Sequence, residues 1–157
     1  MSGFDRNYYI DLIENDYFGN VSKEDIKSAC DCFTGDSEVI IYHGDNPVRL
    51  FYKVPGHGRD SLEVFYEHLV GNYDASFSNF LHTIDLDEQR CASNFLVTLS
   101  PKPDSEYRDI GTLTLNNSNF FRFNKGKIFY MIIYYANPTL GKLLGQVNQS
   151  PTGFPKN

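Results

Sequence analysis

The stretch that decides the fold spans residues 119–138 and reads NFFRFNKGKIFYMIIYYANP. Phe121 and Phe123 alternate with polar residues up to a turn that contains Gly126, and the almost unbroken apolar and aromatic run 128–135 follows. Alternation that meets a glycine-containing turn predicts a β-hairpin. A strand this apolar needs cover on both faces, so we expect helices on one side of the sheet and another subunit on the other.

Upstream of this hairpin, the pattern predicts helices in the N-terminal half and a sheet that follows them. The expected helices are 4–18, a second that Ser22 caps and that reaches Phe33, and a third that Asp60 caps and Gly71 ends; the expected strands are 39–43, 48–54, 76–86, 91–99, 112–123 and 127–135. This order is α+β, with a curved, mostly antiparallel sheet wrapped around three helices. Such a cone has an open end, where a concave apolar pocket is expected.

The length and net charge of the chain favour some classes of protein over others. A chain of 157 residues is typical of a single domain, which we place at 1–137, followed by a partly flexible tail at 138–157. The net charge is −6 and the basic residues are scattered, which argues against nucleic acid. No apolar run reaches the length of about 18 residues that a membrane span needs.

Cysteines and motifs suggest a cytoplasmic protein without a cofactor. The cysteines are Cys30, Cys32 and Cys91, an odd number that favours reduced thiols, and the first residues lack a signal-peptide pattern. Cys30 and Cys32 are two residues apart on the expected helix and face different directions, which argues against a metal site. No phosphate-binding glycine loop is present either, so we expect neither a metal nor an organic cofactor.

Four stretches in this order resemble the nuclear transport factor 2-like superfamily, and more narrowly its SnoaL-like and ketosteroid isomerase-like branch. They are ACDCFTGDSEVIIYHG (29–44), GRDSLEVFYEHLV (58–70), NFLHTIDLDEQRCASNFLV (79–97) and FFRFNKGKIFYMIIYY (120–135). The resemblance covers about residues 5–137 and implies a cone-shaped, cystatin-like α+β roll that pairs into a homodimer through its outer sheet face. The superfamily includes isomerases, cyclases, dehydratases, epoxide hydrolases and members without catalysis, so fold does not settle function.

The resemblance also assigns functional positions. The oxyanion-binding acid of ketosteroid isomerases falls at Asn119, which retains a hydrogen-bond donor, but their general base falls near Ile41. The acid/base Asp of SnoaL-type cyclases falls near Ile133. Scytalone dehydratases are similar at His82 and Asn119, but their second histidine has no counterpart where this chain reads Ser100-Pro101-Lys102.

Strand parity brings candidate site residues together without the resemblance. If Asn119 and Tyr135 face the cone interior, His43 and His82 can converge on the same cavity. A histidine with a pKa near ~6.5 both takes and gives a proton, so the catalytic candidates are His82, Asn119 and His43. Each histidine could instead satisfy a local carbonyl or lie at the pocket rim. The candidate ligand-binding residues are Tyr17, Ile41, Phe121, Met131, Ile133 and Tyr135.

Two functions remain open. The first is a homodimeric small-molecule pocket protein that catalyses proton transfer, as in isomerisation, dehydration or cyclisation, on a hydrophobic carbonyl or hydroxyl compound. The second is a ligand-binding or interaction module without catalysis. A continuous pocket reached by both His82 and Asn119 favours the first, and solid aromatic packing between them favours the second.

Overall fold

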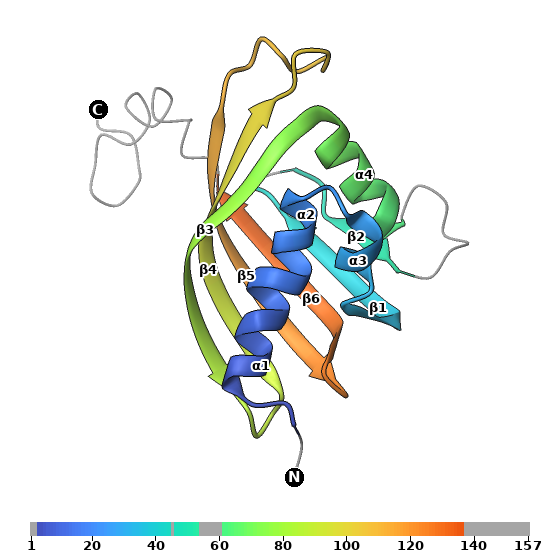
Figure 1. The fold of residues 1–157 in the computed structure, drawn as a ribbon, viewed down its shortest axis with the longest axis vertical. Coiled ribbons are helices and arrows are strands. Elements are labelled where there is room, and N and C mark those ends of the chain that lie inside the picture. Colours follow the sequence, from blue (N-terminus) through green and yellow to red (C-terminus); the bar gives the residue numbers. More distant parts are fainter. Residues whose placement is uncertain (1–2, 45, 54–60, 137–157) are drawn as a thin grey trace.

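The structure is a computed structural model and describes residues 3–44, 46–53 and 61–136. The N-terminal half holds most of the helices, and the longest strands follow α4 (Figure 1). The helices are α1 (Arg6–Asp11), the π-helix η1 (Leu12–Gly19), α2 (Asn20–Ser22), α3 (Ile26–Cys30) and α4 (Leu62–Asn72), and the strands are β1 (Phe33–Tyr42), β2 (Arg49–Tyr52), β3 (Tyr73–Asp85), β4 (Arg90–Pro101), β5 (Leu113–Asn124) and β6 (Lys127–Ala136).

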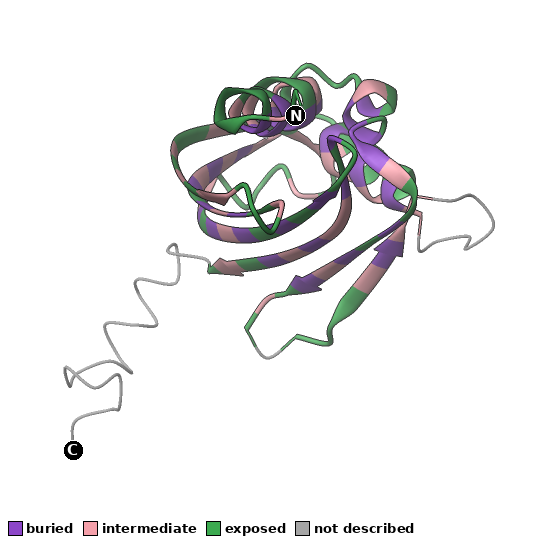
Figure 2. Cartoon of the chain, turned by 90° about the horizontal axis from the view of Figure 1, so that it is seen from below, coloured by how far each residue is buried: buried purple, intermediate pink, exposed green. Residues whose placement is uncertain are grey.

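The strands form one curved sheet in the order β2-β1-β6-β5-β4-β3. Neighbours are antiparallel except β1 and β6, which run parallel. The sheet curls around the N-terminal helix, and buried positions alternate with exposed ones along β4 and β5 (Figure 2). The expected α+β fold, a mostly antiparallel sheet around N-terminal helices, is therefore confirmed.

The hairpin of β5 and β6 forms as the sequence predicts. Its turn places Lys125 and Gly126 at φ 51° and 78°, the left-handed region that two-residue hairpin turns need. A Cβ on Gly126 would lie 2.3 Å from the Phe4 ring, so glycine is needed for space as well. Phe121 and Phe123 lie in the core, whereas Phe120 on the opposite face is 45% exposed. Among the described residues, Phe121 and Phe123 therefore mark the face of this hairpin that packs in the core, and Phe120 marks the face that stays partly exposed.

The first helix is longer than predicted. We expected Gly19-Asn20 to end it, but α1, η1 and α2 follow one another without interruption from Arg6 to Ser22. At Gly19 a Cβ would lie 3.1 Å from the Glu14 carbonyl oxygen, so a glycine here permits the wide π turn instead of ending the helix. The π-helix carries Glu14, Tyr17 and Phe18, whose side chains reach three different parts of the interior.

The second helix is shorter than predicted, and its cap differs. Asp25, not Ser22, is the N-cap, and its carboxylate accepts a hydrogen bond from the Ser28 amide at 3.1 Å. The helix ends at Cys30, and Phe33, which has helical spacing to Ile26, is the first residue of β1. The helix-like spacing of Phe33 arises because both elements bury their apolar residues in the same core.

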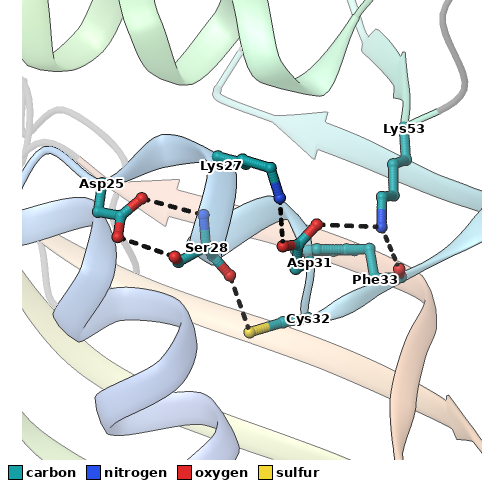
Figure 3. Close-up of polar contacts among 7 residues, drawn as sticks. All are labelled: Asp25, Lys27, Ser28, Asp31, Cys32, Phe33 and Lys53. Carbon is teal, nitrogen blue, oxygen red and sulfur yellow. Dashed lines mark hydrogen bonds and ion pairs between the residues drawn. The ribbon is translucent and has the colours of Figure 1, made fainter.

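Polar contacts hold the junction of α3, β1 and β2 (Figure 3). Asp31 pairs with Lys27 at 3.0 Å and lies 4.0 Å from the Lys53 ammonium group. Lys53 also donates to the Phe33 carbonyl at 2.8 Å, and the Cys32 thiol donates to the Ser28 carbonyl at 3.8 Å. These contacts fix the point where the chain turns from helix into strand.

Several other helices and strands begin or end at residues that differ from the predicted ones. β1 begins at Phe33 rather than 39, and β3 begins at Tyr73 rather than 76, because α4 passes directly into it. Gly71 lies inside α4 instead of following it. The predicted cap Asp60 and the tail 138–157 lie outside the described residues. Among the described helices, none is long and apolar enough to cross a membrane.

Candidate functional site

One row of residues crosses the whole sheet on its inner face. The strand registers place His82, Ser93, Asn119, Ile133, Ile41 and Arg49 opposite one another on β3, β4, β5, β6, β1 and β2. This register row puts the candidate residues His82 and Asn119 two strands apart, with the buried Ser93 between them. The packing of the helices against the row decides which of its members face open space.

A cavity of about 370 Å³ opens along the Asn119 to Arg49 part of this row. Its volume lies at the lower end of the range for small-molecule pockets, roughly 300–1,000 Å³. The walls are mainly apolar and aromatic, and the sheet and α4 supply most of them. The lining residues are Phe18, Ile41, Arg49, Phe65, Tyr66, His68, Leu69, Tyr73, Phe77, Val97, Leu99, Tyr107, Leu115, Asn117, Asn119, Ile133 and Tyr135.

Two buried carboxamides on β5 line this cavity. Asn119 is 1% exposed and Asn117 is 9% exposed, and the Oδ1 atom of each has no hydrogen-bond partner. The Asn119 Nδ2 group donates only to the Met131 sulfur, at 3.6 Å, a weak acceptor. The side chain of Asn119 therefore presents an unpartnered acceptor in addition to the N–H donors of its Nδ2 group, the role that the resemblance implied.

A pair of buried tyrosine hydroxyls lies beside the cavity. Tyr66 on α4 lines the cavity, and its hydroxyl hydrogen-bonds that of Tyr17 on η1. Burial raises the pKa of both phenols above their ordinary value. Both side chains therefore stay neutral near pH 7. If the Tyr17 hydroxyl donates to Tyr66, the Tyr66 proton is available to a compound in the cavity.

The mouth of the cavity carries positive and aromatic groups. The Arg49 guanidinium donates to the Tyr135 hydroxyl at 3.0 Å and lies 5.6 Å and 6.0 Å from the ring centres of Phe65 and Phe51. His43 stacks on Tyr135 with ring centres 4.0 Å apart. Burial, and then the Arg49 charge, lowers the pKa of His43.

His82 lies in a different environment. Its Nε2 atom is 2.7 Å from the Glu14 carboxylate and its Nδ1 atom is 2.7 Å from the Ser93 hydroxyl. We call Glu14, His82 and Ser93 the polar cluster. Phe80 stacks on the His82 ring, and Phe80 and Phe95 pack against Phe18, which lines the cavity. Aromatic side chains thus separate the polar cluster from the cavity.

The structure therefore brings some of the sequence candidates together and separates others. Four of them line the cavity: Ile41, Asn119, Ile133 and Tyr135. Tyr17, Phe121 and Met131 are buried and do not line the cavity. His43 lies at the mouth against Tyr135, and His82 lies in the polar cluster.

Sequence reasoning missed other lining residues. Asn117 shares the strand parity of Asn119, so parity alone could have identified it. Nothing in the local sequence identified Arg49 and Tyr66 as lining residues. Arg49 fits the polar face of an alternating strand equally well, and Tyr66 fits the apolar face of an amphipathic helix equally well. His68 on α4 is exposed and also lines the cavity.

The cysteines are remote from this chemistry. Cys30, Cys32 and Cys91 are buried and free, and burial raises the pKa of the Cys30 and Cys32 thiols to about 12. Within the described ranges, no group of three or more His, Cys, Asp or Glu side chains is placed to hold a metal ion.

Comparison with known proteins places the fold and leaves the activity open. No protein-family model matches the sequence, and no curated protein matches it either. Several solved structures do match this chain. A Bacillus subtilis protein provisionally called an isomerase superposes with a TM-score of 0.65 at 11% identity, over 87% of this chain and 91% of that one. A protein of unknown function with a cystatin-like fold, from Methylobium petroleophilum PM1, gives 0.63 at 14% identity, over 83% and 77%.

A third neighbour is described as an enzyme. SalBIII, an epoxide hydrolase/cyclase-like enzyme in pyran ring formation in the polyether salinomycin, gives a TM-score of 0.63 at 15% identity, over 83% of this chain and 92% of that one. These neighbours confirm the expected cystatin-like α+β fold. At such identities the likeness shows the fold alone.

Proposed function

We propose that this chain, which has the cystatin-like fold of the nuclear transport factor 2-like superfamily, binds a small, largely apolar compound in the cavity beside Asn119. The observation that carries the proposal is the pair of unpartnered carboxamide oxygens of Asn117 and Asn119 on an otherwise apolar wall. An unsatisfied buried polar group costs about 1–3 kcal/mol. A ligand that donates a hydrogen bond to these oxygens would offset that cost.

The cavity also indicates which groups the compound carries. A hydroxyl or N–H suits the Asn117 and Asn119 oxygens, which accept, and a carbonyl suits the Tyr66 hydroxyl when Tyr17 is the donor in the bond between the two phenols. The aromatic walls suit an apolar body. These features together favour a hydroxylated carbonyl compound.

Proton-transfer catalysis on such a compound is the second candidate function. The fold is shared with SalBIII, an epoxide hydrolase/cyclase-like enzyme, and Tyr66 could stabilise negative charge that develops on a carbonyl oxygen. Within the part of the chain that the structure describes, no carboxylate lines the cavity, so His68 is the titratable base we would assign. His68→Gln should then abolish turnover and leave ligand binding intact, whereas a passive binder has no turnover to lose.

The decisive experiment compares binding with stability in Asn119→Leu. Leucine has the same branched shape and the same number of side-chain heavy atoms but no polar atoms, so we expect a gain of about 1 kcal/mol in the free energy of unfolding. We expect ligand affinity to fall about tenfold. Native mass spectrometry of protein purified from its own source identifies the retained compound, and urea denaturation measures stability.

Ser37 provides the matched control. Its hydroxyl is also buried and unpartnered, but the residue does not line the cavity. Ser37→Ala should therefore leave ligand retention unchanged. Wild-type protein that retains no small molecule, combined with an Asn119→Leu variant that is less stable, would contradict a binding role for this cavity.

We further propose that two copies associate through the outer sheet face. Phe120 and Tyr134 on this face are 45% and 44% exposed and contact each other edge to face, and Tyr42 stacks on Tyr134. Aromatic side chains gathered on one surface favour a protein partner. Light scattering should give the mass of a dimer for the wild type and of a monomer for Phe120→Glu. A cytoplasmic location stays a prediction from the sequence.

A further inference from the structure

We propose that the compound bound in the cavity is an amphipathic acid, whose carboxylate binds Arg49 at the mouth while a hydroxyl or N–H of the same molecule binds the carboxamide oxygens of Asn117 and Asn119. This inference rests on the proposed function and adds the chemical class of the ligand. Three features carry it: the charge of Arg49, which has no counter-ion among the described residues, the aromatic surroundings of that charge, and its place in the register row.

The first feature is that Arg49 lacks a counter-ion among the described residues. Lys27, Lys102 and Arg90 each have a carboxylate oxygen within 4.0 Å. Arg49 has a neutral oxygen instead, the Tyr135 hydroxyl at 3.0 Å. A guanidinium group has five N–H donors in a planar fork that matches a carboxylate, so most of its donors remain available.

The second feature is the surroundings of the guanidinium. The rings of Phe65 and Phe51 lie beside it, so one of its sides faces hydrocarbon rather than water. Arg49 itself is exposed, so an anion can reach the guanidinium from its open side. Tyr135 also accepts the hydrogen bond from Arg49, which leaves the phenol proton free to donate to the same anion. Arg49 and Tyr135 therefore form a pair of donors that suits a carboxylate.

The third feature is the distance between the two polar ends. In the register row, Ile41 and Ile133 separate Arg49 from Asn119. Strands lie about 4.8 Å apart, so the two backbones are about 14 Å apart, with aliphatic side chains between them. The Arg49 side chain shortens this distance, since it reaches Tyr135, which lies opposite Asn117. A ligand that satisfies both ends therefore needs an apolar spacer between its carboxylate and its donor group.

The test uses Nile red, a neutral apolar dye, as the probe of the cavity. Medium-chain ω-hydroxy fatty acids, their methyl esters and the unsubstituted fatty acids compete with the dye on the wild type, Arg49→Gln and Arg49→Lys. We expect the hydroxy acid to bind the wild type at least tenfold more tightly than its ester. This preference should disappear in Arg49→Gln and survive in part in Arg49→Lys, which keeps the charge but loses the planar fork.

Each outcome separates the two proposals. Failure of Nile red to bind the wild type would overturn the proposed function itself. Dye binding without displacement by any of the acids, or equal affinity for acid and ester, would overturn the amphipathic acid and leave the pocket intact. An acid preference that persists in Arg49→Gln would place the carboxylate elsewhere. Nile red binding to both Arg49 variants shows that their cavities have formed.

The hydroxyl end is tested on the same fluorescence assay. In the wild type, the ω-hydroxy acid should bind more tightly than the unsubstituted acid, because the hydroxyl satisfies a buried oxygen. In Asn119→Leu the order should reverse, while the preference for acid over ester remains. An unchanged order in this variant would remove Asn119 from the ligand contacts.

Discussion

The polar cluster and the carboxamides of the cavity lie side by side on one sheet, but they differ in how their hydrogen bonds are met. Ser93 and Asn119 are directly opposite each other on β4 and β5, and both are buried. The Ser93 hydroxyl has His82 as a partner, and His82 has Glu14. The Asn119 carbonyl oxygen has none.

This difference assigns different roles to two regions that look alike in sequence. The polar cluster ties the π-helix to β3 and β4, so we expect it to stabilise the fold. The carboxamide oxygens of Asn117 and Asn119 lack hydrogen-bond partners beside the cavity. We therefore expect them to bind a ligand and to lower the stability of the ligand-free protein. Proteins commonly give up stability at functional sites in this way.

The largest expected effect comes from breaking the polar cluster. His82→Ala removes the ring that joins Glu14 and Ser93, leaves the buried Ser93 hydroxyl without this partner, and opens a space beside Phe80. We expect the free energy of unfolding to fall by about 3 kcal/mol, as measured by urea denaturation. Nile red should still bind the folded variant. A loss of dye binding without a loss of stability would instead make His82 a ligand residue.

A smaller effect should follow from the same substitution at two buried serines. Ser93→Ala leaves the Nδ1 atom of His82 without a partner, so we expect a loss of about 1–2 kcal/mol in the free energy of unfolding. Ser37→Ala removes a hydroxyl that has no partner, so we expect no loss or a small gain. Urea denaturation of both variants provides the comparison. Equal losses would show that the hydrogen bonds of the cluster contribute nothing to stability.

The smallest effect concerns pH and His43 at the cavity mouth. Because burial and Arg49 lower the pKa of His43, the folded protein holds this proton less tightly than the unfolded chain does. The contribution of His43 to stability is therefore complete above the ordinary pKa of about 6.5. It is lost as the pH falls from that value through the lowered one. Thermal unfolding across this range should show a slight rise in Tm with pH that His43→Gln removes, whereas an unchanged slope would assign the effect to another group.

The sequence predicts the hairpin of β5 and β6 well because the information is local. Alternation, a glycine at the turn and an apolar run act within about 20 residues, and the inward direction of Asn119 follows from parity. The end of the first helix was not predictable in this way. Gly19 reads as a helix terminator, but the close carbonyl of Glu14 gives it a different use in a π turn.

The sequence alone also could not predict that His82 is separated from the cavity. Parity allows His82 and Asn119 to converge on one cavity, and the strand registers do put them in one row, but Phe18 from the π-helix packs with Phe80 and Phe95 between His82 and the cavity. Which side chains occupy that space depends on how the helix packs on the sheet. Arg49 reaches Tyr135 across β1 for the same reason, since a contact between residues 86 positions apart has no local signature.

The parallel pairing of β1 with β6 has a consequence for the order of folding. The residues it joins, such as Ile41 and Ile133, are far apart in the chain, whereas β3, β4, β5 and β6 are joined by short connections. Closing a long loop costs more entropy than closing a short one, so we expect the antiparallel part to form early and the β1–β6 seam to form late. The cavity straddles this seam. A bound compound would therefore slow unfolding and leave the folding rate nearly unchanged.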